Sequence, residues 1–600
     1  MAEIQNPNQQ GGGGLGGDSR SLLSFMVIFV LLVVAFQIWG PKKQDQKQQP
    51  TESSQQATHL NQPAAAVHET ATPAPAARTA ARSKKAANTA EPTVQAASAA
   101  ETVVENELYR ITFSNRGGEA TSWVLKKYKA EDQKSLLNLV DDPAAAKFGY
   151  PLSLFTYDAG LRDKLNSAMY VPSATGTIAV PGELSYTYSA GGLTVRKTFH
   201  FDTSYLITAD ISVTDNGAPV TALLAWPSGL DGNQSHTQAS SHFSYAAATF
   251  DDSVDGKTDN VAVKKVVGGN TLHGTIDYAG ISDLYFAAEF LPDNPADMSV
   301  VTLNNSIDVP RNPDHPQPNE VDHLPVLGAA VGQFGSPTVH TRVFVGPKSL
   351  DLLQSIHTTN GSNLEHVVSF GWWGWVAKPM LYVLRFFVTH GIPNWGWAIL
   401  VLTFILNLAM LPTRVMMMKS QVKMARIQPA LDAIKAKYAK YKSTDPRRQE
   451  MNKEMFDLQR KEGINMFGSC LPMLLQYPLL FGFYRMLEYA IELRQAHWLW
   501  LTDLSGVDPL HILPIFVIVS MFLSQLMMPS PGMDQSQQRM MAFMMPVVFG
   551  VMMWNIGSGV ALYWAGSNIM GVGTQVVMNR TSMGQELRAI QAKRAAKKKK

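Results

Sequence analysis

The feature that most constrains the fold of this chain is a series of long apolar segments in its last third. One of them, AILVLTFILNLAML from Ala398 to Leu411, contains no charged residue. An apolar helix of about 20 residues is long enough to cross the hydrocarbon core of a bilayer. We therefore expect an α-helical polytopic membrane bundle in this region. Its five spans are expected at 395–411, 470–490, 510–528, 540–554 and 560–577.

The N-terminal part of the chain is organised differently. Residues 21–39 form a further apolar run, which we expect to be a transmembrane anchor behind a short tail, residues 1–20. Residues 40–100 are rich in Gln, Ala, Pro and Ser, a composition typical of a disordered linker. Residues 101–347 alternate short apolar runs such as LTVRKTFHF with Gly, Asn, Asp and Pro turns. That pattern predicts an all-β sandwich domain.

Residues 371–391, between the predicted sandwich and the first of the five spans, are apolar and aromatic but carry Lys378 and Arg385. Charged side chains are costly near the centre of a bilayer, whereas a helix in the interface can keep them in water. We therefore expect an interfacial amphipathic helix here.

Residues 419–463, after the first of the five spans, are basic and have a second kind of pattern. Apolar side chains from Met424 to Tyr441 recur at alternating spacings of three and four, as in a coiled-coil seam. Asp445 and Pro446 then provide an N-cap and a first helical position for a return helix. This predicts a basic helical hairpin.

The distribution of Lys and Arg predicts the topology. The hairpin and the C-terminal tail, residues 578–600, are rich in both, which places them in the cytoplasm. With the anchor there are six expected spans, so the N-terminus is also cytoplasmic and the β-domain lies outside. Lys42 and Lys43 after the anchor favour the opposite orientation, but long domains translocate largely regardless of local charge.

The hairpin offers a candidate recruitment surface for the ribosome, for anionic lipids or for an emerging chain. A solvated face of a helix with no binding role is an equally good explanation of such a basic run. The residues that we single out are Lys419, Lys423, Arg426, Lys435, Arg447 and Arg448.

Polar side chains inside the apolar spans are the candidate functional site. Thr403 and Asn407 are four residues apart and share one face of a helix, and the other spans offer further polar residues. Buried polar groups in lipid need partners or water. The pattern is explained either by hydrogen bonds that hold the bundle together or by a wet groove open to the cytoplasm.

The order of these segments and several motifs resemble the bacterial YidC/Oxa/Alb family of membrane protein insertases, in its Gram-negative form. The motifs are WGWAILVLTFILNLAMLP, FGSCLPMLLQYPLLFGFYRML and SGVALYWAGSN in the bundle, with NELYRITFSNRGGEA and FVGPKSLDLL at the ends of the β-domain. The resemblance implies a five-helix core with a hydrophilic groove that assists the insertion, folding and assembly of inner-membrane proteins.

The resemblance also implies a groove for clients, a set of partners and the absence of catalysis. The partners would be nascent membrane proteins, the ribosome, Sec translocon components and anionic lipids, with the protein acting as a monomer in the inner membrane and needing no cofactor or metal. The expected groove residues are Thr403, Asn407, Gln476, Ser520, Ser524, Tyr563, Trp564 and Ser567.

This sequence departs from the family at one groove position. The family usually has an arginine where this chain has Asn407, so a fixed positive charge is missing there. We expect that Arg414 cannot simply replace it, because seven residues at about 1.5 Å each place it about 10 Å nearer the cytoplasm. Arg485 is also within a span, and we expect it to pair with Glu488.

Two other functions would also explain parts of the sequence. A small-solute transporter would also place polar residues within a bundle, but the spans show no paired acidic residues or inverted repeats. An enzyme with a metal site could use His315, Glu320, Asp322 and His323, but their spacing matches no standard site and predicts a surface loop. The single cysteine, Cys470, excludes an intrachain disulfide.

Overall fold

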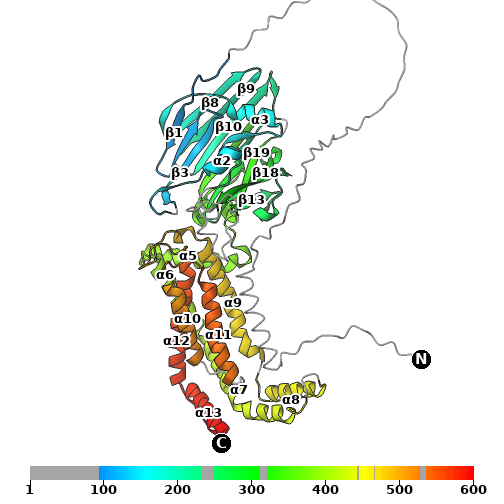
Figure 1. Cartoon of the computed structure of the whole chain (residues 1–600), viewed down its shortest axis with the longest axis vertical. Coiled ribbons are helices and arrows are strands. Elements are labelled where there is room, and N and C mark those ends of the chain that lie inside the picture. Colours follow the sequence, from blue (N-terminus) through cyan, green and yellow to red (C-terminus); the bar gives the residue numbers. More distant parts are fainter. Residues whose placement is uncertain are drawn as a thin grey trace, which may run out of the picture. The chain divides into compact units, whose positions relative to one another are not determined.

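A computed structural model of the chain describes residues 93–130, 132–230, 248–310, 321–333, 336–441, 445–464, 466–527 and 535–599. The chain divides into two compact units, residues 1–91 and 92–600, and the described residues belong to the second. The expected tail, anchor and most of the linker lie outside them. Within the second unit, strands coloured blue to green precede helices coloured yellow to red (Figure 1).

The described residues of the β-domain form three sheets. The first runs in the order β4 (Leu136–Asn138), β3 (Glu119–Lys129), β2 (Tyr109–Ser114), β1 (Glu101–Glu105) and β7 (Gly176–Ala179). The second runs β14 (Lys257–Ala262), β13 (Thr249–Val254), β16 (Ile276–Ser282), β17 (Phe286–Pro292), β20 (Thr338–Pro347), β10 (Leu206–Asp215), β9 (Leu193–Phe201), β8 (Gly182–Ala190) and β6 (Val171–Pro172), with β11 (Ala218–Pro219) on β10. The third runs β15 (Thr271–His273), β18 (Ser299–Pro310), β19 (Val321–Gly332), β12 (Leu223–Trp226) and β5 (Ser153–Phe155).

Aromatic side chains join the three sheets into one sandwich. Phe113 of β2 packs on Phe199 of β9 with ring centroids 5.4 Å apart, and Trp123 of β3 packs on Trp226 of β12 at 5.5 Å. These inward positions alternate with outward ones, as the period of two along a strand requires. The predicted all-β sandwich is therefore confirmed.

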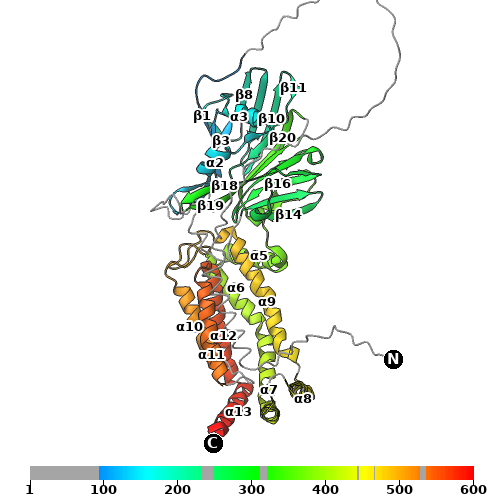
Figure 2. The same ribbon diagram turned by 45° about the vertical axis from the view of Figure 1, so that its right-hand side comes forward.

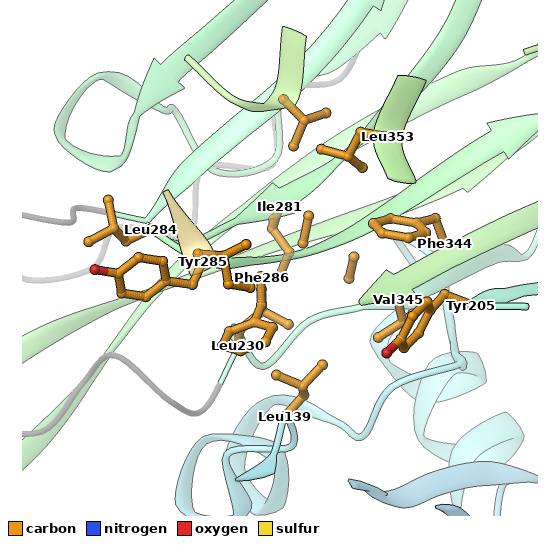
Figure 3. Packing of buried hydrophobic residues seen from close by; sticks show 14 of the residues in the cluster. Leu139, Tyr205, Leu230, Ile281, Leu284, Tyr285, Phe286, Phe344, Val345 and Leu353 are labelled. Atoms are coloured by element: carbon orange, nitrogen blue, oxygen red, sulfur yellow. The ribbon is translucent and has the colours of Figure 1, made fainter. Parts of the chain in front are cut away.

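Buried side chains at the end of β20 and just before β10 continue the same core. In Figure 3, Tyr205 lies beside Val345 and Phe344, and the rings of Tyr205 and Phe344 meet edge to face with centroids 6.5 Å apart. The domain also begins earlier than its predicted boundary, because Val94 pairs with Ser189. That part of the expected linker is therefore attached to the sandwich.

Helices dominate the rest of the described chain. Two short ones, α2 (Asp142–Phe148) and α3 (Ala159–Ser167), belong to the β-domain, and α4 (Leu350–Ser355) follows it. The others are α5 (Gly374–His390), α6 (Trp395–Ala409), α7 (Leu411–Lys437), α8 (Arg447–Lys461), α9 (Met466–Tyr489), α10 (Ile512–Met527), α11 (Gln535–Met553), α12 (Ser558–Arg580) and α13 (Ser582–Lys599). Figures 1 and 2 both show α10, α11 and α12 side by side.

The first predicted span ends in a bend. Helix α6 stops at Ala409 and α7 starts at Leu411, with Pro412 in its first turn, and the two axes differ by 46°. Proline has no backbone N–H to donate to a carbonyl oxygen in the last turn of α6, but it fits the first turn of a new helix. Among the described residues, only this bent pair is long and apolar enough to cross a membrane by those measures, and no single helix is.

Helix α5 occupies the predicted interfacial segment, after a short 3₁₀ turn at Gly371–Trp373. Trp372 and Trp375 are exposed, as aromatic residues at a membrane interface can be. The expectation that Arg385 stays in water is wrong, because its side chain is only 13% exposed and forms ion pairs with Asp351 and Glu492. The carboxylates of Asp351 and Glu492 therefore take the place of water around the guanidinium of Arg385.

The predicted hairpin is formed by α7 and α8. Met424, Ile427 and Leu431 of α7 pack with Met455 and Leu458 of α8, as the seam predicts, and Ile464 completes this cluster. The return helix begins at Arg447, one residue later than expected, and the carboxylate of Asp445 accepts the N–H of Arg447. The C-terminal tail is helical, and α13 packs its Leu587 against Met418 and Val422 of α7.

Candidate functional site

Asn407 is the centre of a group of polar side chains contributed by α6, α7 and α12, which we call the Asn407 cluster. Its Nδ2 donates to the carbonyl oxygen of Thr403, at 2.9 Å, and to the hydroxyl of Ser567, at 3.4 Å. Its Oδ1 accepts a hydrogen bond from the guanidinium of Arg414 at 2.7 Å. Thr403, Asn407 and Ser567, three of the predicted groove residues, therefore lie together.

Arg414 reaches this cluster although the helical rise argued against it. Its second terminal nitrogen donates to the hydroxyl of Thr574 of α12 at 2.8 Å. The expectation that Arg414 lies too far toward the cytoplasm to reach position 407 is wrong for two reasons. The chain bends between α6 and α7, and the long side chain extends back toward Asn407.

The partners of Arg414 are neutral. Among the described residues its guanidinium contacts an amide oxygen and a hydroxyl, and no carboxylate forms an ion pair with it. Arg485 of α9 differs, since it pairs with Glu488 at 3.0 Å as the sequence predicts. The positive charge of Arg414 is therefore hydrogen-bonded but not neutralised by any residue that the structure describes.

Ser520 and Ser524 of α10 lie in a second group of polar residues, which meets α12 at Asn568. The hydroxyl of Ser520 accepts a hydrogen bond from Asn568 at 2.9 Å, and Ser524 donates to the carbonyl oxygen of Ser520 at 2.9 Å. Ser567 and Asn568 are adjacent on α12, where successive side chains point about 100° apart. The polar residues expected to line one groove are thus divided between two clusters.

The remaining predicted groove residues lie apart from one another. Tyr563 stacks on Phe483 of α9, with ring centroids 4.2 Å apart, whereas Trp564 packs on Phe549 of α11 at 5.2 Å. Gln476 of α9 is exposed, and no hydrogen bond within the described part of the chain joins it to either cluster. Tyr563 precedes Ser567 by four residues and lies one turn away from it on α12.

Thr574 is a member of the Asn407 cluster that the sequence analysis did not identify. It follows Ser567 by seven residues, and Arg414 follows Asn407 by the same interval. Seven residues are close to two helical turns, so Ser567 and Thr574 share a face of α12. The same seven-residue interval in the two segments was the signal from which the sequence could have indicated Thr574.

The predicted recruitment surface is divided between exposed cations and cations with partners. Lys419, Lys423 and Lys435 are exposed on α7. Arg426 is also exposed but forms an ion pair with Glu586 of α13 at 2.6 Å.

The two arginines of the recruitment surface at the start of α8 both contact Tyr441. Arg447 lies over the ring of Tyr441, 4.0 Å from its centroid, and Arg448 donates to the carbonyl oxygen of the same residue at 3.0 Å. Tyr441 therefore connects the end of the first hairpin segment to the second.

No metal site is formed by the described residues, in which no group of three or more His, Cys, Asp and Glu side chains could hold an ion. His315 and Glu320 lie outside these residues. The surface loop expected around them is wrong for Val321 and His323, because β19 begins at Val321 and His323 pairs with Asp308 across β18.

Two family descriptions match the chain. The family described as 60Kd inner membrane protein matches residues 387–586, and the one described as YidC periplasmic domain matches residues 101–383. The first match contains both polar clusters and the hairpin, and the second contains the β-sandwich.

Individual proteins are similar over most of the chain. Membrane protein insertase YidC of Geobacter metallireducens is 31% identical over 586 residues, which cover 95% of this chain and 99% of that protein. The same-named protein of Pelobacter propionicus is 32% identical over 504 residues, 80% of this chain and 86% of the other. A crystal structure of an active YidC insertase covers 82% of this chain and 95% of its own at 16% identity, with a TM-score of 0.33.

Proposed function

The chain belongs to the YidC family of inner-membrane protein insertases, and from that premise we propose that its Asn407 cluster receives an anionic group of a client. The observation that carries the proposal is the guanidinium of Arg414, which is held by the neutral acceptors Asn407 and Thr574. Its charge is free to attract a carboxylate, because no residue that the structure describes forms an ion pair with it.

The physical role of the cluster is to lower the cost of moving polar groups into an apolar region. An isolated ion transferred there loses many kcal/mol of hydration unless it finds a counter-ion and hydrogen bonds. Arg414 supplies the charge, and the hydroxyls of Thr574 and Ser567 supply hydrogen-bonding partners. Burial of the client's own apolar helix provides the driving free energy, so this mechanism uses no covalent step and no cofactor.

The test compares one single-span client carrying acidic residues in its translocated tail with the same client carrying neutral ones. We expect Arg414→Gln to lower insertion of the acidic client about tenfold, the factor for one charge-assisted hydrogen bond worth roughly 1.5 kcal/mol. Insertion of the neutral client changes less than twofold. Arg414→Lys retains part of the difference, and Lys437→Gln, which removes an exposed cation of the same helix outside the recruitment surface, serves as the control. An equal loss for both clients contradicts the proposal.

A second experiment distinguishes a client path from simple helix packing. A photoreactive residue at Ser567 is expected to crosslink to a stalled, ribosome-bound client, at the lengths where the client's helix is just emerging. The control is Leu408, whose exposed side chain is on α6. Absence of crosslinks at Ser567 in a folded protein, at every client length, would assign the cluster to packing alone.

The exposed cations of α7 and α8 support a role in recruitment, for which we propose ribosomal RNA as the polyanion. Arg447 stacks on Tyr441, and Lys440 also lies over this ring, 5.2 Å from its centroid. Arginine and lysine beside an aromatic ring suit phosphate and base contacts.

Replacing Lys419, Lys423 and Lys435 by Gln tests this recruitment role. It is expected to weaken ribosome binding and to reduce its dependence on salt concentration, because fewer counter-ions are released. Loss of binding to vesicles of anionic lipid, with ribosome binding unchanged, would assign the surface to the membrane instead.

The topology proposed for the whole chain follows the positive-inside rule. Both termini and the hairpin are cytoplasmic, the β-sandwich is periplasmic, and the protein acts as a monomer, alone or beside Sec translocon components. Labelling of single cysteines placed at Lys593 or at Arg196, in a chain in which Cys470 is replaced by Ser, from each side of the membrane tests the orientation. Labelling of Arg196→Cys from the cytoplasmic side would contradict it.

A further inference from the structure

Two buried acids lie on either side of a glycine in the second sheet, outside the sites described above. Asp251 of β13 pairs in register with Gly280 of β16, and Gly280 pairs in register with Glu289 of β17. The side chains of Asp251 and Glu289 are both fully buried. The strand between the two acids therefore contributes no side chain at this level of the sheet.

Gly280 leaves the space that the carboxyl group of Glu289 occupies. A Cβ atom at position 280 would lie 2.5 Å from Oε2 of Glu289, so this carboxyl group lies over the backbone of Gly280. There it is within hydrogen-bonding reach of Asp251. Neighbouring strands are about 4.8 Å apart, so side chains of β13 and β17 can meet only where β16 places nothing between them.

Asp251 already has donors for its carboxylate. Its Oδ1 accepts a hydrogen bond from the amide of Asn260 at 2.6 Å, and its Oδ2 accepts one from the hydroxyl of Ser282. The same hydroxyl accepts a hydrogen bond from the ammonium of Lys348, which is also buried, at 3.0 Å. These contacts stabilise Asp251 in its ionised form, with Lys348 as the nearby counter-charge.

Glu289 lacks such donors. Neither of its carboxyl oxygens accepts a hydrogen bond from any residue that the structure describes. A buried carboxylate without donors is costly, whereas a neutral carboxylic acid has an O–H group that Asp251 can accept. Burial, and after it the charge of Asp251, raises the pKa of Glu289 well above its ordinary value; Lys348 opposes this shift and Asp252 of β13 adds to it.

The balance of charge around Glu289 leads to the same conclusion. The ammonium of Lys348 lies near the three acids Asp251, Asp283 and Glu289, and it donates to the backbone carbonyl oxygen of Asp283 at 2.8 Å. One ammonium cannot neutralise three carboxylates. The hydroxyl of Tyr278 of β16 faces the same acids and stays neutral, so it adds no charge.

We propose that Glu289 is a neutral carboxylic acid in the folded protein, also at mildly alkaline pH, and that it donates a hydrogen bond to the carboxylate of Asp251. The proton held in this way joins β13 to β17 across Gly280. Through Ser282 and Lys348 the connection continues to the residue that follows β20. Backbone hydrogen bonds join only neighbouring strands, so this proton provides a link that the sheet alone does not have.

Infrared spectroscopy of the full chain in detergent tests the protonation state directly. Protonated and ionised carboxyl groups absorb at different frequencies, and exposed Asp and Glu side chains are ionised at about pH 8.5. The wild type is expected to keep an absorption band of a protonated carboxylic acid at this pH, and Glu289→Gln is expected to lose it. Glu183→Gln, which removes an exposed carboxylate from the same sheet, is the matched control and should keep the band.

Asp251→Asn tests the proposed acceptor. In this variant Lys348 has one acid fewer to balance, and the new amide can donate to Glu289. Glu289 is then expected to ionise, so the band disappears although Glu289 is still present. The proposal is overturned if the wild type has no such band, or if the band survives in Glu289→Gln. A band lost in Glu289→Gln but unchanged in Asp251→Asn would contradict the hydrogen bond to Asp251.

Discussion

Lys197 in the β-sandwich and Arg414 in the helical region both place a cation away from water, but different groups hold them. The ammonium of Lys197 donates to the backbone carbonyl oxygens of Gly117, Gly118 and Leu152, at 2.6, 3.2 and 2.8 Å. Arg414 is held by side chains only. Backbone carbonyls are fixed by the fold, whereas side chains can exchange partners.

The two cations also differ in their neighbouring charge. Burial lowers the pKa of Lys197 to about 8 and raises the pKa of Glu119 to about 7, while the opposite charge of each partner works against that shift. Arg414 has no such carboxylate among the described residues. We infer that a cation held by backbone and balanced by an acid belongs to the fold, and that one held by side chains and unbalanced is available for binding.

The largest expected effect is that of Lys197→Met. It leaves three buried carbonyl oxygens and Glu119 without the ammonium, which should destabilise the β-sandwich by about 3–5 kcal/mol. Chemical unfolding of the full chain in detergent, followed by hydrogen exchange in β2 and β9, measures the loss. Lys127→Met, at an exposed position of β3, is the control. A loss below about 1 kcal/mol would contradict the structural role of Lys197.

Lys197 also shows which features of the sandwich could be predicted from the sequence and which could not. In LTVRKTFHF the alternation correctly assigns Leu193, Val195 and Phe199 to the inner face, and by the same rule it places Lys197 there. The sandwich followed from this periodicity. The partners of Lys197 did not, because they lie on loops and strands 45 to 80 residues away along the chain.

The helical site was predictable in its residues but not in its arrangement. Helical spacing correctly joined Thr403 with Asn407. The return of Arg414 to Asn407 depends on the bend between α6 and α7 and on a side-chain conformation, and neither follows from rise per residue. The separation of Ser520 from Ser567 depends on how α12 is rotated between its neighbours, which only packing determines.

A second prediction concerns Asp283, a buried acid. The nearby cations Lys348 and Arg494 only partly offset the effect of burial on its pKa. Burial raises the pKa of Asp283 to about 6 from 3.8, although the backbone N–H groups of Tyr285 and Phe286 donate to it. A raised pKa means that the folded form holds its proton longer, so stability is lost as the pH rises from about 4 through 6.

Asp283→Asn tests this directly, because the amide keeps an acceptor for both N–H groups but cannot ionise. It is expected to stabilise the sandwich at pH 7.5 by up to about 3 kcal/mol and to remove this part of the pH dependence. Hydrogen exchange in β16 and β17 at pH 4.5 and 7.5 checks it. The same pH dependence in the variant as in the wild type would show that Asp283 is not its source.

A third change, Asn407→Leu, sharpens the assignment of Arg414 to binding. It removes one of the two neutral acceptors of the guanidinium, so Arg414 is less well positioned while its charge remains. We expect insertion of an acidic-tailed client to fall roughly threefold, less than for loss of a full charge-assisted hydrogen bond. Leu408→Ala, at an exposed position of α6, is the control. An effect equal for acidic and neutral clients would indicate a packing role instead.

The smallest effect is expected for the exposed ion pair between Arg426 and Glu586. Glu586→Ala removes the ion pair with Arg426, whose side chain is 60% exposed. Exposed pairs contribute about 0–1 kcal/mol, so the docking of α13 on α7 should persist through Met418, Val422 and Leu587. Hydrogen exchange in α13 measures whether this helix stays docked on α7. Release of the whole helix by this one substitution would show that the pair, and not the apolar contact, holds it.

The bend between α6 and α7 has a consequence for the biogenesis of the insertase itself. An arginine at the centre of a membrane helix adds about 2.5–3.5 kcal/mol to the cost of inserting that helix. Helix α6 contains no charged residue, and the arginine of its polar cluster is carried by the next helix. The apolar first helix of the bent pair is therefore free of this cost, and the charge of the cluster comes from the first turn of α7.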